Sequence, residues 1–258
     1  MYQSLSPIIW VIISLGVLFL LERWIHRHMQ GIAYLITGSL QWSVLLYALI
    51  LFPGVFLHEL SHWIMANLLG MRTGRFSVWP SLQPDGTIRL GYVEFYKTQR
   101  VAPVRESLIG GAPLIFGIGA ILLIGHYVFN ANILAQTVAT GTPQAIGAAL
   151  SGVFSTADAW IWLYLLFSIS NAMMPSPSDR KAWPLFGVIL AILLIILYFA
   201  GFRDEMWQAL IGPITNFAGY LLLAFAITIV VDLFFVVVIL IFEFIVTKLF
   251  GKRIDYSV

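Results

Sequence analysis

The sequence has no cysteine and very little charge, and both absences narrow the class of protein. Of its 258 residues only 10% are charged, the formal net charge is +2, and none is cysteine. Without cysteine, disulfides and thiolate metal sites are excluded. The scarcity of charge excludes an ordinary soluble domain, and the small net charge gives no indication of nucleic acid binding. Hydrophobic residues make up 60% of the chain and the mean hydropathy is +0.92, so we expect a membrane protein.

Long apolar runs are spread over the whole sequence, each bounded by charges, prolines or glycines. A helix of about 20 apolar residues crosses the roughly 30 Å hydrocarbon core of a bilayer. The predicted fold class is an all-α polytopic membrane protein with about six transmembrane helices, at 5–22, 41–69, 108–130, 157–174, 183–201 and 212–249. Residues 31–40 follow the polar stretch ERWIHRHMQG and are expected to lie in the interface. Nothing around Asp232 indicates a turn, so 212–249 is predicted as one long helix.

Lysine and arginine in short loops favour the cytoplasmic side of a membrane. Segment 70–107 contains six basic residues, whereas segment 131–156 contains no charge of either sign. This asymmetry predicts that 70–107 is cytoplasmic and 131–156 external. Arg23 and Arg27 do not agree with this orientation, because a single crossing between them and 70–107 would place them outside.

The stretch LHELSHWIMANLLG, residues 57–70, puts ionisable side chains into an apolar run. His58 and His62 are four residues apart, so on a helix they project from one face, and Glu59 lies beside them. This is the H-E-x-x-H arrangement of zinc peptidases, in which both histidines bind the metal and the glutamate acts on water. The alternative is a set of buried, hydrogen-bonded polar residues. Because ionisable groups in a span are costly, the pattern favours a functional site.

Two histidines do not complete a catalytic zinc site, which commonly has three protein ligands and an open position. The stretch SNAMMPSPSDRKAWP contains Asp179 next to two prolines that break a helix. Such a break frees backbone groups at membrane depth, which is tolerated where protein or a water-filled cavity receives them. Asp179 is therefore the favoured third ligand among the candidates Asp158, Asp179, Asp232, Glu243 and His126.

With these residues the chain resembles the site-2 protease family of intramembrane zinc metalloproteases. That family follows its H-E-x-x-H helix with an N-x-x-P-x-x-x-L-D-G pattern, whose aspartate is the third ligand. The eight-residue offset from Asn171 to Asp179 is preserved, although Pro175 stands one place late and Ser178 and Arg180 replace leucine and glycine. The resemblance implies one Zn²⁺ held by His58, His62 and Asp179, with Glu59 as general base. It also implies that Asn171 contacts substrate backbone; the alternative is an asparagine that satisfies carbonyls of the broken helix.

The resemblance covers roughly residues 41–220. We expect one transmembrane metalloprotease domain, 1–258, with an N-terminal anchor and interfacial segment at 5–40, the catalytic core at 41–220 and a long helix and tail at 221–258. It implies substrates with transmembrane segments, cut within or near the lipid bilayer of a bacterial or archaeal cell, in regulated intramembrane proteolysis. Segment 131–156 is too short for the PDZ domain of many members. A minimal core is therefore expected, and its selection of substrates leaves room for an accessory membrane protein.

Residues 75–97, RFSVWPSLQPDGTIRLGYVEFYK, alternate apolar and polar residues on either side of a Pro-Asp-Gly turn. The pattern predicts a small membrane-associated β-hairpin. In site-2 proteases a β-loop at this position is thought to receive the substrate as an added strand. The alternative is a hairpin that only plugs the cytoplasmic face of the bundle.

Two other functions compete with this interpretation. Prenyl-protein proteases also use H-E-x-x-H, but take a later glutamate as third ligand; the glutamates that follow are Glu94, Glu106, Glu205 and Glu243, none in a convincing helical motif. A metal carrier should line its path with repeated ligands, which this sequence does not offer. A catalytically inactive membrane scaffold would have less need of Glu59, which serves chemistry and not metal binding.

Overall fold

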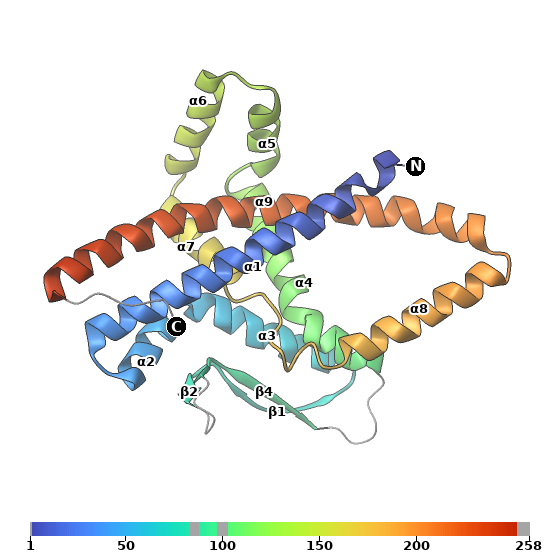
Figure 1. The fold of residues 1–258 in the computed structure, drawn as a ribbon, viewed down its shortest axis with the longest axis horizontal. Helices are drawn as coiled ribbons and strands as arrows, with labels where there is room; N and C mark the ends of the chain where they lie inside the picture. Colours follow the sequence, from blue (N-terminus) through green and yellow to red (C-terminus); the bar gives the residue numbers. More distant parts are fainter. Residues whose placement is uncertain (1, 83–87, 97–102, 252–258) are drawn as a thin grey trace.

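The computed structural model describes residues 2–82, 88–96 and 103–251 and is mostly helical (Figure 1). Its elements, in chain order, are α1 (Tyr2–Thr37), α2 (Leu40–Ile50), α3 (Phe52–Leu68), β1 (Arg72–Ser77), β2 (Ser81–Leu82), β3 (Ile88–Arg89), β4 (Tyr92–Tyr96), α4 (Pro103–Tyr127), α5 (Ala131–Thr140), α6 (Pro143–Phe154), α7 (Ala159–Ser170), α8 (Trp183–Phe199) and α9 (Arg203–Phe250).

The predicted crossing pattern is only partly confirmed. Among the described residues, three helices are long and apolar enough to cross a membrane, in α1, α4 and α9. The pairs α2–α3 and α6–α7 are bent by 76° and 92°, and raise the number to five if each pair forms one span. Helix α8 is apolar but has only 17 residues. The prediction of six spans is therefore not confirmed, and the described chain supports three to five.

The predicted anchor at 5–22 and most of the predicted interfacial segment at 31–40 lie in one helix, and the interfacial position of 31–40 stays a prediction. Helix α1 runs without a break to Thr37, its last residue, and Gly38, which follows it, has a left-handed φ of 63°. The polar stretch between the two predicted segments is part of this helix. Ile25 and Met29 are buried there, while His28 lies 2.7 Å from a carboxylate oxygen of Glu243 in α9. Helix α1 packs along α9, which is continuous through 212–249 as predicted.

The predicted span at 41–69 is two helices. Helix α2 ends at Ile50, Leu51 leaves helical geometry at φ −94° and ψ 7°, and α3 begins with Pro53 in its first turn. Proline has no N–H and suits the first turn of a helix, so the chain bends here instead of continuing straight. Hydropathy alone does not distinguish one straight span from two short helices that meet at an angle.

The predicted β-hairpin is present as two antiparallel strand pairs below α3 in Figure 1. Strand β1 pairs with β4, with an irregularity between Thr73 and Phe76, and the short strands β2 and β3 pair further out. The predicted Pro-Asp-Gly turn falls at 84–86, outside the described residues. The uncharged segment 131–156 contains α5 and α6, which project away from the strands.

Helix α3 packs against α4 and α7, and a glycine makes one of these contacts close. A Cβ atom at Gly54 of α3 would lie 1.9 Å from the carbonyl oxygen of Ser168 in α7. The N–H of Gly54 donates to the Ser168 hydroxyl at 2.8 Å. Only a residue without a side chain allows this approach, which brings the start of α3 against the end of α7.

Candidate metal centre

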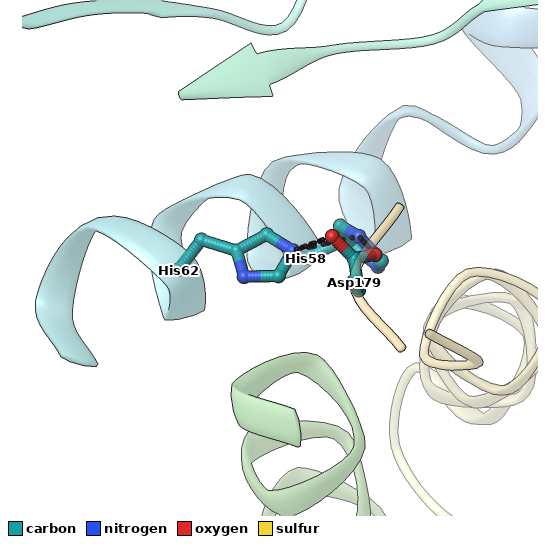
Figure 2. A group of neighbouring side chains, drawn as sticks. All are labelled: His58, His62 and Asp179. Atoms are coloured by element: carbon teal, nitrogen blue, oxygen red, sulfur yellow. Dashed lines mark hydrogen bonds and ion pairs between the residues drawn. The ribbon is translucent and has the colours of Figure 1, made fainter. Parts of the chain in front are cut away.

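Helix α3 brings His58 and His62 together, as the four-residue spacing predicts. The Nε2 atoms of the two rings lie 3.2 Å apart, and His62 is buried while His58 is half-buried (Figure 2). Helical periodicity alone explains this contact, because residues i and i+4 are neighbours on one face. The pair is therefore a local consequence of the sequence.

The opposite ring nitrogens are held by backbone carbonyls from other elements. Nδ1 of His58 donates to the Ala172 carbonyl at 2.6 Å, just after α7, and Nδ1 of His62 donates to the Ile109 carbonyl in α4 at 2.8 Å. A histidine that donates through Nδ1 in its neutral form has a lone pair on Nε2. Both rings thus turn a nitrogen that is able to bind a metal into the same space, as metal-ligating histidines do when their other nitrogen is fixed by a hydrogen bond.

The loop after α7 brings Asp179 to the same space. Its Oδ1 lies 3.5 Å from Nε2 of His62 and its Oδ2 lies 3.7 Å from Nε2 of His58 (Figure 2). The backbone N–H of Ser176 donates to Oδ2 at 2.8 Å and fixes the carboxylate. Helix α4 supports the loop closely, since a Cβ atom at Gly110 would lie 2.0 Å from the Asp179 carbonyl oxygen.

The three side chains fit a metal ion by both distance and chemistry. Ligand atoms bound at 2.0–2.2 Å in a tetrahedral site are separated by about 3.4 Å. The corresponding separations here are 3.2, 3.5 and 3.7 Å. With the ring hydrogens on Nδ1, two Nε2 lone pairs and a carboxylate face one another, a donor set that suits a cation; without a cation, a hydrogen on Nε2 can bind the carboxylate instead. Among the described residues, His58, His62 and Asp179 form a group that could hold a metal ion.

The surroundings of Asp179 keep its carboxylate ionised, which is the form that binds a metal ion. It lies in the loop between α7 and α8, outside the apolar helices. Burial alone would raise the pKa of Asp179, but the hydrogen bonds with His58 and His62 and the Ser176 N–H outweigh it and hold that pKa well below its usual range. The group is therefore ionised at neutral pH, as a ligand must be.

Glu59 is buried in α3 beside the first histidine, and the β-strands approach its carboxylate. A Cβ atom at Gly91, just before β4, would lie 2.7 Å from Glu59 Cγ and 2.9 Å from its Oε1. The backbone at 91 thus comes as close to Glu59 as a glycine allows. The sequence motifs do not identify Gly91 or Gly110 as part of the site. A glycine within the alternating pattern of a strand is a signal of such close approach.

The other candidates for the third ligand lie elsewhere. Asp232 of α9 accepts hydrogen bonds from the end of α7, and Glu243 lies against His28. Asp158 precedes the first turn of α7, and His126 stacks edge-on against the neighbouring Tyr127. The glutamates considered for the prenyl-protease pattern do not join the described metal group either: Glu94 accepts from the Arg75 N–H, Glu106 is in the first turn of α4, and the side chain of Glu205 is outside the described residues.

Asn171 is buried at the end of α7, with 3% of its surface exposed. Its Nδ2 donates to the Phe167 carbonyl at 2.9 Å and to Oδ1 of Asp232 at 3.0 Å, and its Oδ1 has no hydrogen-bond partner within the described part of the chain. The bond to Phe167 matches the alternative role considered from the sequence, an asparagine that satisfies carbonyls at a helix end. Contact of Asn171 with substrate stays a prediction.

Compared with protein-family models, with curated proteins and with solved structures, the chain matches none of them. The relation to site-2 proteases is thus a resemblance that rests on residues 58–62 and 171–179. The function has to be argued from the geometry of the site.

Proposed function

We propose that this protein is an intramembrane zinc endopeptidase that hydrolyses peptide bonds in or near transmembrane segments of other proteins. The observation that carries the proposal is the convergence of His58, His62 and Asp179, with Glu59 buried beside them on the same helix. Imidazole and carboxylate ligands suit zinc, and three protein ligands leave an open position for water or substrate, as in catalytic zinc sites.

Each residue has a defined part in the proposed reaction. His58, His62 and Asp179 hold the ion. When bound, zinc supplies a Lewis acid that polarises the scissile carbonyl and makes water acidic enough to lose a proton near neutral pH. Glu59 accepts the proton of the attacking water and then donates it to the leaving amine nitrogen, so that it acts first as base and then as acid. Its burial in α3 shields this proton from exchange with solvent.

The strands beside the site are the proposed place for the substrate. A helical substrate hides its carbonyls in its own hydrogen bonds and must be unwound before attack. An extended segment can be held as an added strand, because a two-stranded sheet has open edges. Gly91 immediately precedes β4 and lies against Glu59, so a segment added at β4 would run close to the metal group.

Gly91→Ala should lower cleavage without loss of metal. The added Cβ must displace either the Glu59 carboxylate or the strand, and a catalytic group displaced by about 1 Å can cost on the order of a hundredfold in rate. The measurement is the cleavage rate at saturating zinc, together with bound zinc. Gly119→Ala is the matched control, because no atom lies within 4 Å of the added Cβ there. Equal rates for both variants would show that the close approach has no catalytic role.

The prenyl-protein-protease alternative is less well supported, because Asp179 takes the place of the required glutamate. In the protease Glu59 is the general base, whereas in a metal carrier or an inactive scaffold it would have no chemical role. Neither needs a buried carboxylate beside the ligands, so catalysis is the reason for it in our proposal.

The direct test combines metal analysis with cleavage. Purified protein is analysed for zinc, reconstituted in liposomes, and given a generic single-span membrane protein as substrate. We expect about one zinc per chain, cleavage within or near the span, loss of cleavage with a chelator, and recovery on adding zinc. Bound zinc with no cleavage of any membrane substrate would overturn the peptidase and favour the carrier or scaffold.

The proposed orientation places the metal centre nearer the cytoplasmic face, with 70–107 inside and 131–156 outside. Single cysteines in this cysteine-free chain test it. Trp79, which is 67% exposed between β1 and β2, and Gln144, which is exposed in α6, are suitable positions. An impermeant thiol reagent on intact cells should label Gln144→Cys and not Trp79→Cys, whereas both should be labelled after lysis. The reverse pattern on intact cells would contradict the orientation.

A further inference from the structure

The end of α7 is held by histidines from two different helices. Nε2 of His26 in α1 donates to the Asn171 carbonyl at 3.0 Å, and Nδ1 of His58 in α3 donates to the next carbonyl, that of Ala172, at 2.6 Å. Carbonyls in the last turn of a helix have no partner within the helix, so they are available to side chains. One of these two histidines is a proposed metal ligand, and the other is 32 residues earlier in the chain.

His26 is fixed at its other nitrogen as well. Its Nδ1 forms a hydrogen bond with the hydroxyl of Tyr47 in α2, and a Glu22 oxygen lies 3.6 Å from its Nε2. With Nδ1 accepting from Tyr47, Nε2 carries the hydrogen that Asn171 accepts. The ring is thus held in both position and tautomer.

Helix α9 holds the same end of α7 through a buried acid. Asp232 is 2% exposed, and its Oδ1 lies 2.9 Å from the Ser170 hydroxyl and 3.0 Å from Nδ2 of Asn171. A carboxylate inside an apolar bundle is expensive and persists only with such partners. Helices α1 and α9 therefore each bind this end of α7 through a polar side chain. His26 of α1 binds Asn171, and Asp232 of α9 binds Ser170 and Asn171, the two residues before Ala172.

We propose that His26 and Asp232 are positioning residues of the metal centre. They fix the end of α7, and through it the Ala172 carbonyl that sets the tautomer and direction of the His58 ring. The proposal rests on the proposed metal site. Groups that orient a ligand from behind are typically worth about 10–100-fold in metal affinity or activity. On this view α1 and α9, which contribute no ligand, decide how well the ligands on α3 are aligned.

The apolar contacts between α1 and α9 do not explain these bonds. The two helices also contact one another directly through a polar pair, His28 and Glu243 at 2.7 Å. That contact joins α1 to α9 but has no part in the bonds to Ser170 and Asn171. It provides a matched control, since its loss weakens the same helix pair and leaves the end of α7 untouched.

The test measures metal affinity in the full-length protein. His26→Phe and Asp232→Leu remove the donor and the acceptor, whereas His26→Gln and Asp232→Asn keep an amide N–H or a carbonyl oxygen in a similar place. Zn²⁺ and Co²⁺ affinities are measured by chelator competition, the visible spectrum of bound Co²⁺ reports ligand geometry, and thermal unfolding reports the fold. We expect affinity to fall about 10–100-fold in His26→Phe and Asp232→Leu, with an altered Co²⁺ spectrum. His26→Gln, Asp232→Asn and His28→Phe should stay close to the unaltered protein.

Unchanged affinity and spectrum in the folded His26→Phe and Asp232→Leu variants would overturn the inference. So would an equal loss in His28→Phe, which would show that general packing of α1 on α9 is responsible. If the two disruptive variants do not fold, the conservative pair decides, because weakened metal binding in folded His26→Gln and Asp232→Asn contradicts the proposal and full affinity agrees with it. Zinc binding without cleavage would defeat the proposed peptidase but not this inference, which is read from affinity alone. An unaltered protein that binds neither ion defeats both.

Discussion

Glu59→Gln should leave zinc bound and lower cleavage by at least about a hundredfold, the typical cost of losing a general base. Glutamine keeps the size and hydrogen bonding of glutamate but has no basic carboxylate. The proposed ligands His58, His62 and Asp179 are untouched, so metal content should equal that of the unaltered protein. The measurement is the initial cleavage rate of a membrane substrate in liposomes, together with zinc per chain in the same preparation.

The matched control for this variant is Glu106→Gln in the first turn of α4, the same change outside the metal group. It should cleave at the normal rate. If the unaltered protein binds zinc and cleaves, and Glu59→Gln cleaves equally well, then Glu59 is not the base. If no cleavage is found in any form that binds zinc, the carrier or scaffold takes the place of the peptidase.

Removing any one ligand should cost metal and activity together. His58→Ala, His62→Ala and Asp179→Ala each leave two ligands, which have neither the affinity nor the geometry of three. We expect less than stoichiometric zinc after dialysis and no measurable cleavage. This pattern differs from that of Glu59→Gln, in which metal and activity separate, and the difference distinguishes a ligand from a base.

Asp179→Ala is the sharpest of the three variants, because the sequence around Asp179 departs from the family pattern. Asp158→Ala and His126→Ala are suitable controls, since both residues were candidates and the structure places them outside the group. Stoichiometric zinc and normal cleavage in Asp179→Ala would mean that the third ligand is another residue. A loss in Asp158→Ala with none in Asp179→Ala would identify that residue.

Several features of the site can be predicted from the sequence because they are local. The pairing of His58 with His62 follows from helical spacing, and the break of helix before Asp179 follows from Pro175 and Pro177. The strands beside the site follow from alternation around a turn. The predicted spans were less successful. Hydropathy records how apolar a stretch is, and not where it bends, so it predicts an apolar run at 41–69 but not the 76° bend between α2 and α3.

The sequence by itself determined that this is an apolar, helical chain with an H-E-x-x-H motif. Composition belongs to the chain as a whole and the spacing of a motif to residues close together in the sequence, so neither depends on tertiary packing. Only the tertiary structure decided which of five candidate residues joins the two histidines. It also decided which backbone carbonyls orient their rings, and which glycine lies against Glu59. Those contacts join residues as far apart as His58 and Ala172, or His26 and Asn171. Such contacts depend on how closely the helices pack, and a backbone carbonyl that accepts a hydrogen bond has no signature in the residue that carries it.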